Sequence, residues 1–423
     1  MSSTPTNRIV EFSLMNPITQ SDPFEFYAAL HEDCPVYQMP ETGFYLVSRY
    51  DDLRQVLRDT DTFSNDVNVK HGKGLQGELG VLYEDIVAQR GWAHVQTLQR
   101  TDPPVHSRYR KLLDRVFTVK RVREMAPYVD EVTHELIDGW INEGQCEFNA
   151  QFAMPLPGII IAEQLGLDRK DIKTFKRWSD ALISLAIRRM TEQEIRETAE
   201  IELEMQHFLF NVFEERRRNP TGDLISALVH AHGDDEEPLS MHELQNVMHQ
   251  LISGGFETTQ SAIAHGMWLL LRYPQTMQRL RDDPSLIARF CEEALRFESP
   301  VQGLARMTTR DVELAGTHIP KGSMVLTRYG AANRDPARFE CPAQFDIDRP
   351  NAGAHLAFGS GPHFCVGASL ARQEMVSAFT ALLDRLDDIR LERELPSPVH
   401  HPSLYFMPMK ELPITFRKRQ ART

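Results

Sequence analysis

The sequence predicts a mainly α-helical protein with a small β region. Apolar residues recur at three- and four-residue steps over most of residues 105–270, which is typical of amphipathic helices. Short β-rich pieces, separated by glycine or proline, occur near both ends of the chain. The 423 residues include 41% hydrophobic residues, enough for a sizeable core. We therefore expect a lead-in at residues 1–22 and a single domain over residues 23–423.

The composition argues against several classes of protein. A net charge of −13 disfavours general binding to nucleic acid or to an anionic membrane surface. The five cysteines are an odd number without a CxxC pair, which is typical of a reducing compartment. Residues 1–17 contain no apolar segment of signal-peptide type, and the longest apolar runs are too short to span a bilayer. We expect a cytoplasmic protein with no membrane span and no nucleic-acid partner.

A helix is expected at residues 23–30. A hairpin follows, with strands at 36–39 and 44–48, and then a second helix at 50–58. Glycines interrupt residues 66–101, and a loop of that length inside a compact domain is usually functional. Asp102-Pro103-Pro104 then begins a helix, because an Asp cap followed by proline in the first turn is a start signal. His106 and Arg110 lie on one face of this helix, four residues apart.

Three long helices are expected after it, at 171–185, 191–218 and 240–272. In the middle of the last one, Gly254 and Gly255 cost stability, roughly 1 kcal/mol each relative to alanine. They imply the close approach of a ligand or a local opening of the helix. Close packing against another helix is the alternative, but the acid and the alcohol that follow, Glu257 and Thr258, favour a functional site.

Asp283-Pro284 begins another helix, in which Glu293 and Arg296 share one face. Alone, such a pair is a weak signal, because most are surface salt bridges of little value. Short β-like pieces follow at residues 307–324, and residues 396–416 are expected to form a small hairpin.

Residues 358–367 form the most informative stretch. Glycines and a proline make it a tight loop, and an apolar helical pattern follows at once, so Cys365 lies where a loop enters a helix. The free N–H groups and the helix dipole at such a place stabilise a thiolate. Gly367 allows a flat ligand to approach the backbone closely. From these residues alone, the thiolate is either a nucleophile or a ligand for a metal.

The order Phe, Gly, x, Gly, x, His, x, Cys, x, Gly resembles the haem-ligand loop of the cytochrome P-450 superfamily. The resemblance extends over residues 23–416, with the motifs in the family's order. It implies the triangular helical haem domain of that family, haem b (iron protoporphyrin IX) as cofactor, and Cys365 as the axial ligand of the iron.

The resemblance also implies roles for other residues. Those that it places at the haem are His106, Arg110, Arg306, Phe358, His363 and Gly367, the cations among them as partners of the propionates. Glu257 and Thr258 would relay protons to the oxygen that is reduced at the haem. Glu293 and Arg296 would pair with the downstream Arg349 and lock the fold around the cysteine loop.

The expected lining of the substrate pocket, by position, consists of Gln250, Ser253, Gly254, Gln302, Leu304 and Tyr405. Polar groups in a site that is usually apolar suggest a substrate with an oxygen function, although each could equally bind water or a backbone group. The substrate class is accordingly an apolar terpenoid, steroid, fatty acid or aromatic compound.

The predicted function is monooxygenation, with electrons from NAD(P)H through a separate ferredoxin and ferredoxin reductase, by a monomeric protein. The face around Arg108, Arg110, Lys111 and Arg372 is expected to dock the acidic ferredoxin. A peroxide-driven peroxygenase is one alternative, which Glu257 and Thr258 disfavour. A haem-thiolate gas sensor is the other, but it would need a signalling domain for which the continuous pattern leaves no room.

Overall fold

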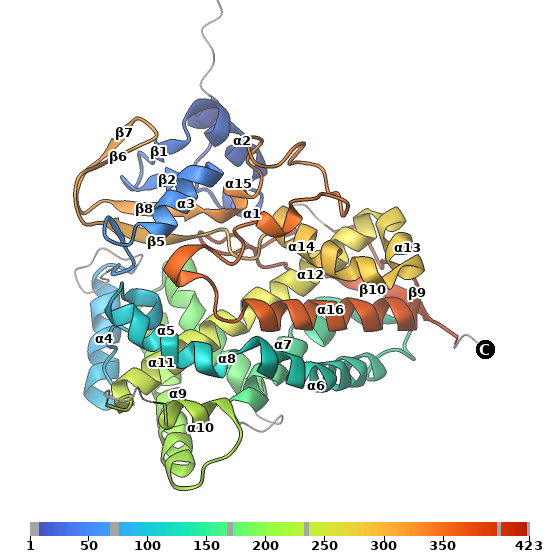
Figure 1. Cartoon of the computed structure of the whole chain (residues 1–423), viewed down its shortest axis with the longest axis horizontal. Helices are drawn as coiled ribbons and strands as arrows, with labels where there is room; N and C mark the ends of the chain where they lie inside the picture. The colour runs from blue at the N-terminus through green and yellow to red at the C-terminus, as the bar shows by residue number, and fades with distance from the viewer. Residues whose placement is uncertain (1–7, 68–75, 167–171, 232–236, 396–398, 421–423) are drawn as a thin grey trace, which may run out of the picture.

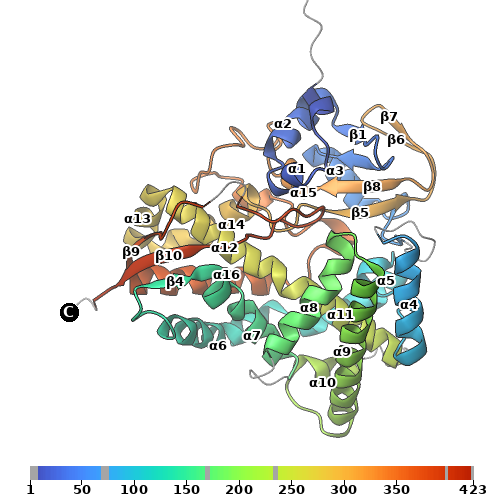
Figure 2. The same ribbon diagram turned by 180° about the vertical axis from the view of Figure 1, so that it is seen from behind.

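The computed structural model describes residues 8–67, 76–166, 172–231, 237–395 and 399–420. Helices form most of the molecule, and a small sheet lies at one end of it (Figure 1). Figure 2 shows the same division from behind, with the main sheet at the top and the long helices below it. The prediction of a mainly α fold with a small β region is confirmed.

The main sheet has five strands in the order β1-β2-β8-β5-β3, with β2 and β8 parallel and the other neighbours antiparallel. Its strands are β1 (Val36–Gln38), β2 (Tyr45–Val47), β3 (Phe63–Ser64), β5 (Gly303–Thr308) and β8 (Met324–Arg328). The predicted hairpin of β1 and β2 is confirmed, and β5 and β8 fall near the β-like pieces expected around residues 307–324. The pair β6 (Val312–Leu314) and β7 (Thr317–Ile319) extends from the same region.

Short helices accompany this sheet at the N-terminal end of the chain. They are the 3-10 helix η1 (Arg8–Glu11), α1 (Pro17–Ser21), α2 (Phe24–Asp33) and α3 (Tyr50–Arg58), with the short α15 (Tyr329–Ala332) beside them. Ile9 and Leu14 are buried in one cluster with Phe26 and Leu30 of α2. The first residues are therefore folded onto the domain from Arg8 onward, and the expectation of a loose lead-in is wrong for them.

The glycine-rich segment before residue 102 contains a helix that the sequence analysis missed. Glu78–Arg90 form α4, which packs on the long helix α9 (Glu192–Arg218), and the 3-10 turn η3 (Leu98–Arg100) follows. Residues 68–75 of this segment lie outside the described residues. Gly91, directly after α4, passes so close to α9 that a Cβ would lie 2.3 Å from the amide oxygen of Gln206.

The helical part of the molecule is built from α5 (Val105–Val116), α6 (Val119–Asp138), α7 (Pro155–Gln164), α8 (Ile172–Ile187), α9, α10 (Leu224–Val229), α11 (Met241–Gly255), α12 (Glu257–Arg272), α13 (Pro274–Asp282), α14 (Ile287–Phe297) and α16 (Ala368–Arg385). Helix α5 begins where the Pro-Pro pair predicts, but Asp102 does not cap it. The Asp102 carboxylate instead accepts hydrogen bonds from the Ser64 hydroxyl and the Asn65 N–H, and so ties β3 to the start of α5.

The expected helix at 240–272 is interrupted. Helix α11 ends at Gly255, α12 begins at Glu257, and the backbone of Phe256 between them leaves regular geometry with ψ at −69°. A Cβ on Gly158 of α7 would lie 2.4 Å from the Phe256 ring, so α7 presses closely on the break. The local opening that the two glycines predicted is confirmed.

The core is largest between α6, α12, α14 and α16. Helices α12 and α16 touch at Gly266, where a Cβ would lie 2.3 Å from the Phe379 ring. A second sheet, β4 (Gln145–Glu147), β10 (Pro413–Lys418) and β9 (Leu386–Leu391), closes the far end. The expected hairpin at 396–416 is replaced by an isolated bridge between His400 and Met409, while residues 396–398 lie outside the described residues. None of the helices in the described ranges is both long and apolar enough to cross a membrane.

Candidate active site

Cys365 lies in a tight loop just before α16. Gly359 and Gly361 have φ angles of +73° and +74°, in the left-handed region that favours glycine. A Cβ on Gly361 would also lie 2.7 Å from the backbone oxygen of Leu57, so the loop packs closely against α3. The Cys365 N–H donates to the Phe358 carbonyl at 2.9 Å. These constraints fix the thiol at the entrance to the helix.

The Cys365 side chain is accessible to solvent, although protein surrounds it closely. Burial raises the pKa of its thiol, against the opposing effects of the Gly367 and Ala368 N–H groups, Arg110 and Arg372. The N–H groups at the helix entrance therefore lower the pKa of the thiol, but by less than burial raises it. A positive charge at Sγ would complete the deprotonation, and a metal ion supplies one. This favours the metal-ligand interpretation over the nucleophile.

Basic side chains gather beside this loop. His106 and Arg110 come from α5, Arg306 from β5, and His363 from the loop itself. The rings of His106 and His363 have centroids 4.1 Å apart, and both side chains are buried or nearly so. Burial lowers the pKa of His363 to about 3, and His106 and Arg306 add to the effect, whereas Asp102 opposes it. Nε2 of His363 is buried without a hydrogen-bond partner among the described residues.

Glu257 and Thr258 lie at the break between α11 and α12. Burial raises the pKa of Glu257 to about 7, although the nearby Lys176 of α8 lowers it in part. The Thr258 hydroxyl donates to the Gly254 carbonyl at 2.8 Å, which belongs to the last turn of α11. A Cβ on Gly254 would meet no atom of the described residues within 4 Å, so among these residues this turn borders open space. The break thus places a carboxyl that exchanges its proton near neutral pH beside a hydroxyl at the edge of that space.

The structure gives two of the polar residues expected in the pocket other partners. Gln250 donates to the Thr97 hydroxyl at 2.8 Å and accepts from the Gln99 N–H at 2.9 Å, and so ties α11 to the segment after α4. Gln302 is fully buried, accepts from the Tyr27 hydroxyl at 2.7 Å, and donates to a backbone carbonyl at 2.6 Å. Both amides therefore satisfy groups of the protein itself.

The other expected pocket residues keep more open surroundings. Among the described residues, the Ser253 hydroxyl has one contact, a long one of 3.4 Å to a backbone carbonyl of its own helix. Gly254 borders the open space described above, while Leu304 on β5 and Tyr405 are partly buried. Burial raises the pKa of Tyr405. Their contact with a substrate stays a prediction.

Glu293, Arg296 and Arg349 meet in the protein interior. Arg296 donates through Nε and Nη2 to the two oxygens of Glu293, each at 2.7 Å. Arg349 adds a contact of 3.3 Å from its Nε. Arg296 also donates to the carbonyls of Asn333 and Gln344, so the network holds the segment that leads to the cysteine loop. The three residues that the sequence analysis grouped, Glu293, Arg296 and Arg349, are therefore in contact in the folded protein.

Arg372 has a partner that sequence reasoning missed. Its guanidinium makes two hydrogen bonds to Glu292, at 2.6 Å and 3.0 Å, and lies 4.5 Å from the centre of the Phe358 ring. Burial acts to raise the pKa of Glu292, but His355 and Arg372 hold it at about 2. Glu292 directly precedes Glu293 on α14, and no local pattern distinguishes the two carboxylates.

Comparison with known proteins agrees with this geometry. The sequence profile of the family described as cytochrome P-450 matches residues 167–412. The chain is 35% identical over 408 residues to 6-deoxyerythronolide B hydroxylase of Saccharopolyspora erythraea, covering 94% of this chain and 98% of that protein. It is 38% identical over 372 residues to mycinamicin IV hydroxylase/epoxidase of Micromonospora griseorubida, covering 86% and 88% respectively. The solved structure of CYP109Q5 from Chondromyces apiculatus superimposes with a TM-score of 0.84 at 32% identity, covering 97% of this chain and 99% of that one.

The chain belongs to the cytochrome P-450 family. It is an enzyme of the monooxygenase type, and haem b is the cofactor of the family. The described residues fit that cofactor. A thiol at a helix entrance suits the iron. His363 Nε2 is buried, has no hydrogen-bond partner among the described residues and lies 3.8 Å from Asp102 Oδ1, and with Arg306 and Arg110 nearby it suits a propionate carboxylate. Gly254, beside the open space, lies in the last turn of α11, and the next helix, α12, packs at Gly266 against α16, which follows the cysteine loop.

The cytochrome P-450 site also contains a residue that no sequence motif indicated. Lys176 lies near Glu257 and is the first of the charged groups that act on it. It comes from α8, some 80 positions away along the chain, so only the folded structure brings the two together. The signal available beforehand was the basic character of α8, which does not distinguish Lys176 from its neighbours.

Proposed function

We propose that this cytochrome P-450 inserts one atom of O2 into an apolar small molecule, with electrons from NAD(P)H through a ferredoxin and a ferredoxin reductase. The observation that carries the proposal is the acid and alcohol at the helix break, Glu257 and Thr258, beside open space. Reduction of O2 consumes protons, whereas a peroxide-driven enzyme of the same fold would not need this pair. Bound haem supplies the oxygen and electron chemistry, and the protein supplies binding, orientation and protons.

Each of the two residues has a distinct task in this proposal. The Glu257 carboxyl, with a pKa of about 7, takes a proton from the side of α8 and releases it toward the open space. The Thr258 hydroxyl accepts a hydrogen bond there while it donates its own proton to the Gly254 carbonyl. It therefore positions a water molecule or the reacting oxygen and is not itself the proton source.

The substrate is proposed to be predominantly apolar. Because Gln250 and Gln302 are engaged by Thr97, Gln99 and Tyr27, the pocket offers fewer free polar groups than the sequence indicated. The names of two relatives refer to 6-deoxyerythronolide B and mycinamicin IV, which extends the candidates beyond terpenoids, steroids, fatty acids and aromatics to polyketide macrolides. Ser253 and Tyr405 would provide the remaining polar contacts.

The proposed electron donor docks on the face that carries the cysteine loop. Two of the arginines expected on this face have partners within the protein, because Arg110 donates to the Phe364 carbonyl and Arg372 is paired with Glu292, so Lys111 is the better probe of docking. Lys111 on α5 is exposed, and Phe364 in the cysteine loop is 40% exposed, so both can contact a partner. Small, weak electron-transfer interfaces use such rim charges mainly to raise the association rate.

A reconstituted assay tests the proposal. Purified holoenzyme is first screened with macrolides, steroids, terpenoids and fatty acids for a shift of the haem Soret band. The best ligand is then supplied with NADH, a bacterial ferredoxin and its reductase, or with hydrogen peroxide alone. We expect hydroxylated product with the electron donors and O2, and little with peroxide. Product formation that is equally fast with peroxide, and unchanged in Thr258→Ala, would support the peroxygenase instead.

A further inference from the structure

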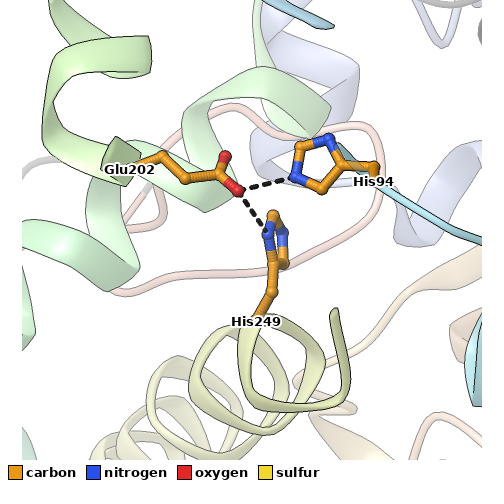
Figure 3. A group of neighbouring side chains, drawn as sticks. All are labelled: His94, Glu202 and His249. Atoms are coloured by element: carbon orange, nitrogen blue, oxygen red, sulfur yellow. Dashed lines mark hydrogen bonds and ion pairs between the residues drawn. The ribbon is translucent and has the colours of Figure 1, made fainter. Parts of the chain in front are cut away.

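A cluster of metal-ligating side chains lies away from the cysteine loop. His94 follows α4, Glu202 lies on α9, and His249 lies on α11, and their side chains point toward one another (Figure 3). One ligand atom from each lies within 4.8 Å of the others. The three segments are far apart in the sequence, so the fold and not a local motif assembles them.

The carboxylate of Glu202 is bonded unevenly. Its side chain is 1% exposed, and Oε1 alone faces His94 Nε2 at 2.6 Å, His249 Nδ1 at 3.4 Å and Gln206 Nε2 at 3.1 Å. The other oxygen, Oε2, is buried and has no hydrogen-bond partner among the described residues. A buried carboxylate needs a compensating charge, and the described residues offer this one no lysine or arginine within ion-pair distance.

His94 lies between two carboxylates. Its Nδ1 is 2.8 Å from Glu84 Oε2, and its Nε2 faces Glu202. A neutral imidazole has one N–H and one lone pair, so only one of these carboxylates can accept a hydrogen bond from it. If Nδ1–H donates to Glu84, the Nε2 lone pair points at a carboxylate oxygen, and a cation between them removes the repulsion.

This arrangement matches a known pattern of metal ligation. A histidine that binds a metal through one nitrogen commonly donates its other N–H to a carboxylate, and Glu84, 2.8 Å from His94 Nδ1, is placed to accept that hydrogen bond. Two imidazoles and one carboxylate form a usual zinc ligand set, with a fourth position for water. Ligands at about 2.1 Å from a tetrahedral ion lie about 3.4 Å apart. The distance from Glu202 Oε1 to His249 Nδ1 already has this value. The distance from Oε1 to His94 Nε2 is shorter, and a rotation of the Glu202 carboxylate that turns Oε2 toward the ion would lengthen it.

We propose that His94, Glu202 and His249 form a site for a divalent transition-metal ion of the zinc class, with Glu84 orienting His94. The ion would join the segment after α4 to α9 and α11. Gln206 supports the same junction, since it accepts from the Trp92 N–H at 2.8 Å and donates to the Trp92 carbonyl at 3.1 Å. Because Gln250, the next residue on α11, also binds this segment, the ion would add a second link between the segment after α4 and the helix that carries Gly254.

Metal uptake by the holoprotein tests the site. Wild type, Glu202→Gln and His249→Ala are stripped with a chelator, equilibrated by dialysis against ZnCl2, and analysed for zinc and for haem. The matched control is His207→Ala, an exposed histidine on α9 whose ring contacts Trp92 but does not belong to the cluster. We expect one tightly held zinc per chain in wild type and in the control, and an affinity at least 10-fold lower in Glu202→Gln and His249→Ala.

A thermal measurement gives an independent result. At a free zinc concentration 100-fold above the dissociation constant, the unfolding midpoint of wild type should rise by about 3 °C, and that of Glu202→Gln should not. The haem spectrum of each variant shows whether it is folded. Wild type that takes up no zinc would overturn the proposal, and so would uptake that Glu202→Gln and His249→Ala retain in full, because the ion would then bind elsewhere.

Discussion

Replacing Glu293 by glutamine tests the buried ion network most directly. The side chains of Glu293 and Arg296 are both 0% exposed, and that of Arg349 is 6% exposed. The glutamine keeps the size of the side chain and one acceptor oxygen, but it removes the charge that the two guanidinium groups share. Because breaking a buried pair leaves an uncompensated charge in the interior, the expected loss is roughly 3–5 kcal/mol in the free energy of unfolding.

The chain provides a matched control in Glu214 and Arg217. These residues are also three apart on one helix and form an ion pair of 2.6 Å, but their side chains are 39% and 37% exposed. Solvent screens such a pair, so Glu214→Gln should cost only about 0.2–1 kcal/mol. The comparison separates the effect of burial from the effect of removing one carboxylate from a helix.

The measurement is urea unfolding of the holoprotein, followed in parallel by far-ultraviolet circular dichroism and by the Soret band. Arg296 also holds the carbonyls of Asn333 and Gln344, on the path to the cysteine loop, so haem loss in Glu293→Gln should precede loss of helix. If Glu293→Gln unfolds within 1 kcal/mol of Glu214→Gln and retains its haem equally well, the network is not what holds this region together.

Four further predictions concern the active site. Cys365→Ala should abolish the red-shifted Soret band of the reduced carbon-monoxide complex, and a wild-type band of the histidine-ligated type would refute the assignment. Thr258→Ala should keep substrate binding but lower the product formed per NADH, with peroxide released instead; unchanged coupling would remove Thr258 from the mechanism. Because the pKa of Glu257 is raised to about 7, the protonated fraction of its carboxyl falls as pH rises through 7. Coupled turnover of wild type should therefore decline in this range, and that of Glu257→Gln should not. Identical pH profiles of the two proteins would contradict the relay. Lys111→Glu should slow stopped-flow reduction by an acidic ferredoxin, as salt does, and indifference to both would place the docking face elsewhere.

Local patterns predicted much of the fold. The helices at 50–58 and 191–218 and the hairpin at 36–48 each have their own period and their own start or turn signals. The break at Phe256 was also predictable, because two adjacent glycines weaken a helix wherever it lies. Helix α4 was missed for the opposite reason: glycines on both sides made the whole segment resemble a loop, while its packing on α9 stabilises the helix.

The site divides in the same way. The cysteine loop was predictable because its chemistry is encoded within ten consecutive residues. The partners of Gln302, Arg372 and Glu257 were not, since Tyr27, Glu292 and Lys176 come from other parts of the chain. Residue type indicates that a buried amide or guanidinium needs partners, but only the fold determines which groups supply them.

This difference bears on the substrate. A polar residue at a pocket position suggests a polar substrate only if its hydrogen-bonding groups remain free. The Gln302 amide accepts a hydrogen bond from the hydroxyl of Tyr27 and donates one to a backbone carbonyl. Tyr27 precedes Gln302 by 275 residues in the sequence. Replacing it would leave buried groups unpaired and cost stability before it changed specificity. Specificity is therefore better sought at Ser253, next to the open turn at Gly254, because the partner of its hydroxyl in the described part of the chain is a carbonyl of its own helix at 3.4 Å.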